Sequence, residues 1–231
     1  VSRIKLLHHL GCHTLLADEM GLGKTVQALA VLHSTEKSAL PDLVVCPASV
    51  VPVWIKEAKT HFPKLQTAVL SQGQNFINSS IQPSLWVASY TQLRRHRQLL
   101  EQVEFRHAVL DEAQMIKNPK AKGTQACLSI RSTYRMALSG TPIENSALDL
   151  WTIFRFLMPG LLGSRKDLEK SLSTDSLKIH SILQRQVTPF VLRRLKKDVA
   201  KELPPKIEAE LPCRLNQEQL NTYRKLAKEG I

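Results

Sequence analysis

A short segment near the beginning of the chain, Asp-Glu-Met-Gly-Leu-Gly-Lys-Thr at positions 18–25, limits the fold more than any other part of the sequence. An apolar run typical of a strand precedes it at 14–17, and an apolar run typical of a helix follows it at 26–32. A Gly-x-Gly-Lys-Thr turn in this setting directs successive backbone N–H groups toward one point at the N-terminus of a helix. The segment therefore predicts a phosphate-binding loop.

The nucleotide-binding candidates in this loop are Gly21, Leu22, Gly23, Lys24 and Thr25. Lys24 is expected to reach the terminal phosphates, and the Thr25 hydroxyl is expected to reach Mg²⁺. The stricter form of the pattern has glycine five residues before Gly23, where this chain has Asp18. An ordinary strand-to-helix turn that happens to contain Gly-Lys-Thr is the alternative, and the context of the turn favours phosphate binding.

A pair of carboxylates ends a second strand-like run. Residues 106–110 lead into Asp111 and Glu112. In open α/β sheets ligands bind beyond the carboxyl ends of the strands. There Asp111 can hold Mg²⁺, and Glu112 can orient the water that attacks the γ-phosphate. A solvated pair that caps the next segment is the alternative; it is the poorer explanation when a phosphate loop precedes the pair.

The first 140 residues alternate between strand-like and helix-like runs. Strands are expected at 13–18, 43–47, 67–71, 85–90, 107–112 and 135–139, and helices at 24–33, 50–61, 92–102 and 124–131. The strands lack strict polar–apolar alternation, as expected for strands buried on both faces. This order predicts an α/β fold with a parallel sheet between two helical layers.

The pattern changes after Gly140. Helices are expected at 147–157, 177–186, 196–202 and 216–229, the last with Asn216 as its N-cap, and one strand-like run is present at 206–211. The C-terminal part is therefore mainly helical, and it is basic.

The net charge and the cysteines indicate which partners and which compartment to expect. Thirty-two Lys and Arg residues against twenty Asp and Glu give a net charge of +12. This charge favours a polyanionic partner, of which nucleic acid is the first candidate and an acidic membrane surface the second. Cys12, Cys46, Cys127 and Cys213 lack the spacing of a zinc site and are interpreted as free thiols of a reducing compartment. No apolar run approaches the length of a membrane span. We expect an intracellular protein, in the cytoplasm or nucleoid of a bacterium or in a eukaryotic nucleus.

Several separated segments together resemble one family, the Swi/Snf-type DNA translocases of helicase superfamily two. They include Asp-Glu-Ala-Gln at 111–114 and Leu-Ser-Gly-Thr-Pro-Ile-Glu-Asn at 138–145. The remaining segments, in the order of the family, are 16–25, 44–49 with Trp54 and 62–63, 89–90, 116–118, 150–151, 156–160 and 189–194. The resemblance extends from about residue 15 to residue 223, and Asp18 in the nucleotide loop agrees with it.

This resemblance implies a RecA-like lobe of the P-loop NTPase type that binds ATP and Mg²⁺. Lys24, Asp111 and Glu112 would be catalytic, with Thr25 and Asp111 at the metal and Glu112 as general base. The expected domains are a first RecA-like lobe at 1–160 and a helical extension at 161–231. The second RecA-like lobe and its arginine fingers are absent after Ile231, so little hydrolysis is expected of this segment alone.

The resemblance also implies residues that couple the nucleotide to nucleic acid: Gln114, Ser139, Gly140 and Thr141. A simple strand-ending turn is the alternative for residues 139–142. Contacts to a nucleic-acid backbone, which carry no base information, are implied for Pro47, Ala48, Ser49, Ser89, Tyr90 and Thr91. Arg94, Arg95 and Arg97 follow and extend this grip, unless they form only a solvated helix face. Trp54, Trp86 and Trp151 are interpreted as core or lobe-packing residues.

Arg193 and Arg194 follow an apolar run and precede two lysines. They form either the solvated start of a basic helix or part of an interface with DNA or the second lobe.

The leading hypothesis is the first motor lobe of an ATP-dependent translocase on double-stranded DNA. An RNA helicase of the same superfamily is the first alternative; the sequences at 111–114 and 139–142 argue against it. A non-catalytic docking module is the second alternative, and intact Lys24, Asp111 and Glu112 argue against that.

Overall fold

The computed structural model describes residues 1–34, 39–71, 83–100, 102–140, 147–199, 211–212 and 215–229. The chain forms two compact units, Val1–Val199 and Ala200–Ile231. The first contains the sheet and the helices around it. Within the described part of the second is the helix α10, Gln217–Glu229.

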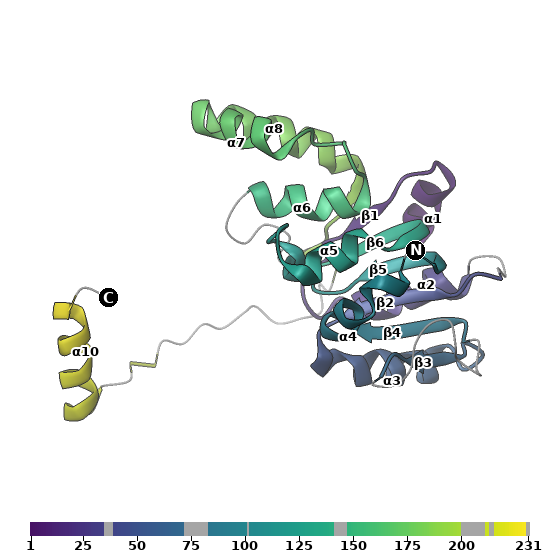
Figure 1. Cartoon of the computed structure of the whole chain (residues 1–231), viewed down its shortest axis with the longest axis horizontal. Helices are drawn as coiled ribbons and strands as arrows, with labels where there is room; N and C mark the ends of the chain where they lie inside the picture. Colours follow the sequence, from purple (N-terminus) through teal and green to yellow (C-terminus); the bar gives the residue numbers. More distant parts are fainter. Residues whose placement is uncertain are drawn as a thin grey trace. The chain divides into compact units, whose positions relative to one another are not determined.

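A parallel sheet of seven strands forms the centre of the first unit (Figure 1). Its strands are β1 (Thr14–Leu16), β2 (Asp42–Cys46), β3 (Thr67–Val69), β4 (Leu85–Ser89), β5 (Glu104–Leu110), β6 (Arg131–Leu138) and β7 (Val191–Leu192). They lie in the order β3-β4-β2-β5-β6-β1-β7, and every pairing is parallel. All the segments that follow these strands therefore begin at the same edge of the sheet.

The helices that pack on the two faces of this sheet are α1 (Ser2–His9), α2 (Lys24–Ser34), α3 (Val51–His61), α4 (Tyr90–Arg95), α5 (Lys122–Leu128) and α6 (Ala147–Leu157). The other helices of the first unit are α7 (Arg165–Thr174), α8 (Ser176–Val187) and α9 (Lys196–Val199). Short 3₁₀ turns lie at Ala48–Val50, Arg97–Leu99, Ala113–Ile116 and Thr188–Phe190.

Successive residues of one strand enter different cores, because side chains alternate across a strand. In β2, Leu43 and Val45 belong to the core that includes α4, α5 and α6, whereas Val44 belongs to the core that includes α2 and α3. Both sets are fully buried. This two-sided burial explains the continuous apolar runs in the sequence and confirms the expected three-layer α/β fold.

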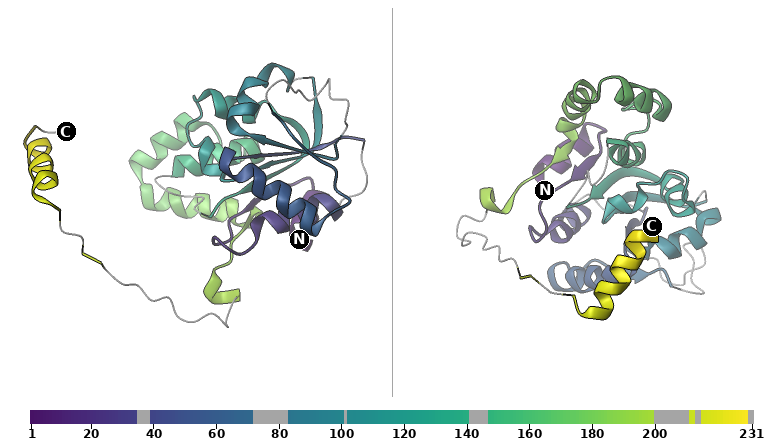
Figure 2. Two further views of the ribbon diagram at one scale, coloured as in Figure 1. Left: turned by 90° about the horizontal axis from the view of Figure 1, so that it is seen from below. Right: turned by 90° about the vertical axis from the view of Figure 1, so that its left-hand side faces the viewer.

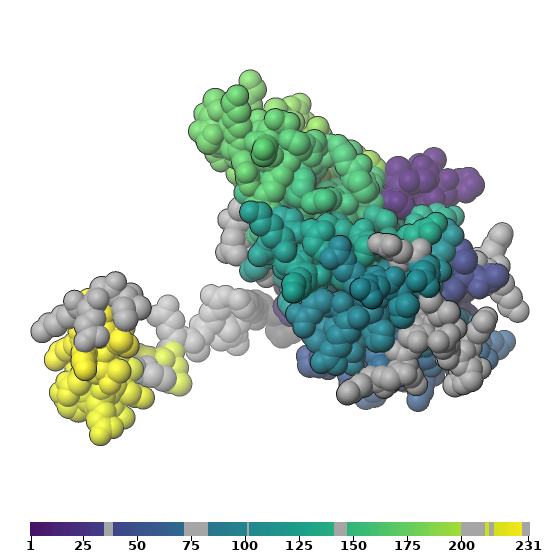
Figure 3. All heavy atoms as spheres, viewed as in Figure 1, coloured from purple at the N-terminus to yellow at the C-terminus, as the bar shows by residue number. Residues whose placement is uncertain are grey.

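The helices α6, α7 and α8 follow the sixth strand and extend to one side of the sheet (Figure 2). In Figure 3, α7 and α8 form a projection at one end of the first unit, whereas α6 also packs against the core of the sheet. A small core holds them together, made by Ala147, Trp151, Leu168 and Leu183. The chain then returns from α8 to the sheet as β7, next to β1.

The structure confirms a strand in each of the six ranges expected in the first 140 residues, with the last beginning earlier, at Arg131, and it confirms the helix at 147–157. The helix expected at 92–102 is wrong in its bounds, since α4 ends at Arg95 and a 3₁₀ turn follows at Arg97–Leu99. The structure also corrects the helix expected at 124–131, since α5 ends at Leu128 and Arg131 begins β6. Asn216 caps α10 as expected, with its Oδ1 accepting a hydrogen bond of 2.9 Å from the Gln219 amide.

Among the α-helices and strands of the described residues, α1, α7 and β7 were not expected from the sequence. β7 has two residues, too few to show a pattern, and only its pairing with β1 reveals it. Most of the strand-like run at 206–211 lies outside the described residues. The domain boundary expected at residue 160 stays a prediction, although β7 joins the sheet of the first lobe from beyond it.

The described cysteines Cys12, Cys46 and Cys127 are free, and burial raises the pKa of the Cys46 and Cys127 thiols to about 12. Cys213 lies outside the described residues. Among the described helices none combines the length and the apolar character required to cross a membrane.

A group of histidines is buried near the amino ends of the central strands. His8 stacks on Tyr134 with ring centroids 4.8 Å apart and also lies beside His107. The Nδ1 atom of His107 lies 2.9 Å from the buried Asp42 carboxylate. Burial lowers the pKa of His8 to about 3, and burial together with the Arg135 charge lowers that of His13 to about 4.

These pKa values predict a loss of stability in mild acid. In the unfolded chain both histidines bind a proton below their ordinary pKa of about 6.5. In the folded chain His13 is protonated only below about pH 4 and His8 only below about pH 3. The free energy of unfolding therefore decreases as the pH falls from about 6.5 toward these values. Urea unfolding of the chain between pH 7.5 and 4.5 measures the loss. His8→Gln should flatten this pH dependence, whereas His9→Gln, at an exposed position on the same helix, should leave its slope unchanged. An identical slope in the His8 variant would contradict this assignment.

Candidate functional site

The residues predicted to carry chemistry converge on the carboxyl edge of the sheet. The 18–25 loop follows β1, Asp111 follows β5, and Ser139 follows β6. These three strands are neighbours in the order β5-β6-β1. The candidate nucleic-acid contacts at 47–49 and 89–91 begin at the ends of β2 and β4, farther along the same edge.

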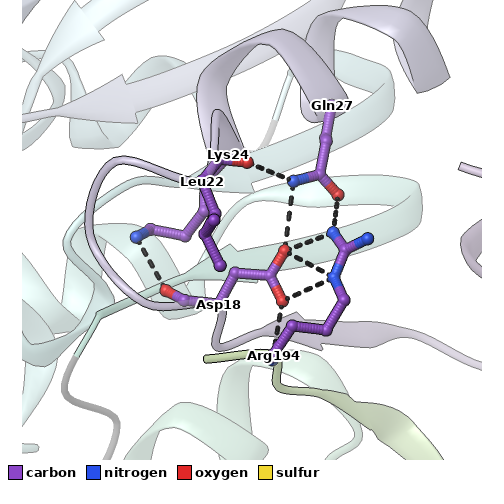
Figure 4. Close-up of polar contacts among 5 residues, drawn as sticks. All are labelled: Asp18, Leu22, Lys24, Gln27 and Arg194. Carbon is purple, nitrogen blue, oxygen red and sulfur yellow. Dashed lines mark hydrogen bonds and ion pairs between the residues drawn. The ribbon is translucent and has the colours of Figure 1, made fainter. Parts of the chain in front are cut away.

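The phosphate-binding loop has the backbone conformation that its glycines allow. Gly21 and Gly23 have φ values of 87° and 71°, in the left-handed region that side chains other than glycine rarely adopt. Lys24 is the first residue of α2, an eleven-residue helix. Its Nζ donates a hydrogen bond of 2.9 Å to the Asp18 carbonyl across the loop (Figure 4). The loop, the helix N-terminus and the lysine thus have the arrangement that phosphate binding requires, and the binding itself stays a prediction.

Asp111 follows β5 and is buried, with 6% of its surface exposed. Its Oδ2 accepts a hydrogen bond of 2.8 Å from the Trp54 indole, and its Oδ1 accepts one of 3.0 Å from the Glu112 amide. Burial raises the pKa of Asp111 and the Glu112 charge adds to this, while the Trp54 hydrogen bond and the Lys24 charge oppose it. A buried carboxylate in this state favours a nearby cation.

Glu112 occupies an unusual backbone conformation, with φ 48° and ψ 56°. Among the described residues it is the single non-glycine residue with positive φ. Such strain is found at functional sites, where the surrounding structure maintains it. It turns the chain sharply after Asp111, so that two adjacent carboxylates can take different roles.

A chain of hydrogen bonds connects Glu112 to the end of β6. The Gln114 amide nitrogen donates to Glu112 Oε2 over 2.7 Å, and the Ser139 hydroxyl donates to Gln114 Oε1 over 2.9 Å. The predicted coupling residues Gln114 and Ser139 are therefore linked to the carboxylate predicted as general base.

Gly140 lies against the phosphate-binding loop. A Cβ atom at this position would lie 2.9 Å from Met20 Cγ and 3.7 Å from Lys24 Nζ. The end of β6 thus approaches the loop closely because glycine is present. Thr141, the fourth residue of the predicted coupling set, lies outside the described residues.

The residues predicted to contact nucleic acid differ in their exposure and in whether their side chains already form hydrogen bonds. Ala48, Ser49, Thr91, Arg94 and Arg95 are exposed and Pro47 is half-buried. The Ser89 hydroxyl accepts a hydrogen bond of 3.2 Å from the Gln92 amide and caps α4. The Tyr90 hydroxyl donates a hydrogen bond of 2.8 Å to the Asp111 carbonyl. The side chains of these last two residues are therefore engaged within the lobe.

Sequence reasoning missed two parts of the site. Trp54 was expected only to pack in the core; it is fully buried, and its indole also binds Asp111. Arg194 was left between a solvated position and an interface; its guanidinium contacts the Asp18 carboxylate and the Gln27 side chain (Figure 4). No local pattern identifies either contact, because each joins segments far apart in the sequence.

The site fits Mg²⁺ bound together with a nucleotide. In the described part of the chain no cluster of three or more His, Cys, Asp or Glu side chains is arranged to hold a metal. Mg²⁺ usually keeps several waters and binds through one or two protein groups plus phosphate oxygens. The buried Asp111 carboxylate, beside Lys24 and the first turn of α2, provides that kind of partial ligand set.

A separate cavity of about 270 Å³ lies at α7 and α8. Its wall is mostly apolar and includes Leu161, Leu168, Ile179 and Leu183. None of the predicted site residues lines it, so it belongs to the helical projection and not to the chemistry at the sheet edge.

The family model of the SNF2-related domain matches residues 4–231. The chain belongs to the SNF2-related family. This membership confirms the Swi/Snf-type resemblance found in the sequence, and with it a helicase superfamily-two ATPase lobe.

Relatives of the SNF2-related chain include eukaryotic and bacterial proteins. It is 33% identical to TATA-binding protein-associated factor MOT1 of Saccharomyces cerevisiae, over 99% of this chain and 14% of that protein. It is 37% identical to an uncharacterized ATP-dependent helicase of Mycoplasma pneumoniae, over 94% of this chain and 22% of that protein. The chain thus spans less than a quarter of the length of these two relatives.

Solved structures confirm the fold of the SNF2-related chain. The SWI2/SNF2 ATPase core of Sulfolobus solfataricus in complex with double-stranded DNA is 38% identical, with a TM-score of 0.80. The match covers 99% of this chain and 50% of that one. A structure of the SWI2/SNF2 ATPase core domain of Sulfolobus solfataricus matches with a TM-score of 0.77 at 38% identity, over 99% of this chain and 49% of that one.

The Trp54–Asp111 hydrogen bond predicts a measurable cost of removing the indole. Trp54→Phe should lower the free energy of unfolding by roughly 1.5–3 kcal/mol, because it takes a donor from a buried carboxylate. Trp151→Phe is the matched control, since the Trp151 indole donates to a neutral carbonyl, that of Gly163, over 3.0 Å; its cost should be nearer 0.5–1.5 kcal/mol. Equal losses in urea titrations would contradict a specific role for the charged acceptor.

Proposed function

We propose that this chain is the first motor lobe of an ATP-dependent translocase on double-stranded DNA. The observation that carries the proposal is the convergence of the phosphate-binding loop, Asp111 and the Glu112–Gln114–Ser139 chain of hydrogen bonds at one sheet edge. Family membership and the likeness to a SWI2/SNF2 ATPase core in complex with double-stranded DNA support it.

In this proposal the lobe holds ATP by its phosphates. The backbone at residues 21–23 and the N-terminus of α2 bind the phosphate oxygens, and Lys24 neutralises charge on the transferred group. Thr25 and Asp111 would hold Mg²⁺, which when bound would supply positive charge to the phosphates. Glu112 orients and deprotonates the attacking water.

The same network gives a route from nucleotide to DNA. Gln114 contacts both Glu112 and Ser139, so a change at the γ-phosphate can alter the end of β6. DNA would bind through its phosphates at residues 47–49, Thr91, Arg94 and Arg95. A second RecA-like lobe, carried elsewhere in a longer protein, would close the nucleotide cleft and supply the arginine fingers.

Two tests separate this proposal from its alternatives. In a protein that joins the chain to its second lobe, duplex DNA should stimulate ATP hydrolysis. Stimulation by single-stranded RNA without stimulation by duplex DNA would instead indicate an RNA helicase. A chain without affinity for MgATP would indicate a docking module.

Lys24→Ala should remove most of the affinity of the chain for MgATP, because it deletes the charge that faces the phosphates. Lys166→Ala, at an exposed position on α7, is the control and should bind as the unmodified chain does. Equilibrium titration with a fluorescent ATP analogue measures both. Unchanged binding in the Lys24 variant would contradict the proposed role of the loop.

The chain alone should bind duplex DNA weakly and hydrolyse ATP near the background rate, because half of the cleft is missing. Each phosphate contact should contribute about −0.9 to the slope of log K against log salt, and the affinity should be nearly independent of base sequence. A salt titration with two unrelated duplexes tests this. Salt-insensitive, sequence-selective binding would contradict backbone recognition, and strong DNA-stimulated turnover would contradict the need for a second lobe.

A further inference from the structure

Asp18 presents an electrostatic problem at the base of the phosphate-binding loop. Its side chain is fully buried, and its own carbonyl accepts the hydrogen bond from Lys24 Nζ. A buried carboxylate is costly unless it is paired, and a negative charge beside the loop also repels the phosphates of a nucleotide. The chain must therefore compensate this charge if the loop is to bind ATP.

Arg194, near the C-terminal end of the first unit in sequence, compensates the negative charge of Asp18. β7 pairs with β1, and the Ala17 amide donates to the Leu192 carbonyl over 2.7 Å. This pairing carries the chain past the loop, where the Arg194 amide donates to Asp18 Oδ1 over 3.0 Å. The Arg194 guanidinium then binds both carboxylate oxygens, with Nε 3.2 Å from each (Figure 4).

Gln27 closes the cluster from the first turns of α2. Its amide nitrogen donates to Asp18 Oδ2 over 3.1 Å and to the Leu22 carbonyl over 2.9 Å, while its oxygen accepts from Arg194 over 2.7 Å. The loop is thus fixed at its beginning and at Leu22 by one group of three side chains. Burial alone would raise the pKa of Asp18, but the hydrogen bonds from Arg194 and Gln27 and the Arg194 charge lower it overall.

The segment after β7 makes further contacts with the loop. The Glu19 amide donates to the Arg194 carbonyl over 3.0 Å, and the Lys196 amide donates to Glu19 Oε2 over 2.7 Å. The Lys196 ammonium lies over Gly21, 3.3 Å from the position that a Cβ atom would take there. The segment therefore brings two cations to the loop.

We propose that Arg194 is a positioning residue for nucleotide binding, which neutralises Asp18 and so keeps the phosphate-binding loop receptive to the ATP phosphates. This inference rests on the proposed function, since it assumes that the loop binds ATP. If Arg194 has this role, the segment that follows α8 is part of the nucleotide site. The chain that leaves α8 is then bound to the phosphate-binding loop through Asp18 and Glu19.

Charge-changing variants of the chain test this role. Arg194→Gln should weaken MgATP binding by about tenfold or more, as expected for one uncompensated, partly screened charge. The loss should be greater for ATP than for ADP, because ATP carries more charge. Arg194→Lys should retain most of the affinity. The double variant Asp18→Asn with Arg194→Gln should recover it, because the negative charge and its partner are removed together.

Arg185→Gln, at an exposed position on α8, is the control and should bind MgATP as the unmodified chain does. Circular dichroism and thermal unfolding of every variant establish that it is folded. A purely structural role for Arg194 predicts equal losses for ATP and ADP and no recovery in the double variant, and either result would overturn the proposal. If Arg194→Gln does not fold, a folded double variant that fails to bind MgATP overturns it equally.

The outcomes also separate this inference from the function on which it rests. An unmodified chain that does not bind MgATP contradicts the proposed function itself. An unmodified chain that binds MgATP, with an Arg194→Gln variant that binds equally well, contradicts the role of Arg194 and leaves the proposed function standing.

Discussion

The position of β1 between β6 and β7 is the constraint on which the rest of the site depends. The phosphate-binding loop begins where β1 ends, so its place is fixed by the strands on either side. β6 places Gly140 so close to Met20 and Lys24 that a side chain at this position would contact both, and β7 places Arg194 beside Asp18. Parallel pairing makes this possible, because it places the ends of all three strands at one edge.

The carboxylates of Asp18, Asp111 and Glu112 lie at this edge of the sheet, and each has different hydrogen-bond partners. Asp18 is neutralised by an arginine, and Asp111 is buried with an indole and a backbone amide as donors. Glu112 lies in a left-handed conformation and is held by Gln114. The first arrangement removes a negative charge from the loop, while the second leaves a carboxylate that favours a cation. This difference separates a structural carboxylate from one suited to Mg²⁺.

Much of the fold was predictable because its signals are local. Each of the first six strands is an apolar run long enough to recognise, and each is followed by a turn with polar or glycine residues, as at 18–25 and 111–114. The two residues of β7 carry no such signal. The end of α5 was placed too late, because residues 129–131 lack a strong stop signal and pairing with β5 decides that Arg131 is a strand residue.

The sequence by itself determined which residue types stand where chemistry is predicted: a lysine and threonine at a helix start, glycines with the required backbone freedom, and an acidic pair after a strand. These depend on residue type and short spacing, which the sequence displays directly. Only the tertiary structure decided the partners: Trp54 for Asp111, Gln114 between Glu112 and Ser139, and Arg194 for Asp18. Asp18 and Arg194 are separated by 176 positions, and the order of strands in the sheet, which no local pattern encodes, is what brings them together.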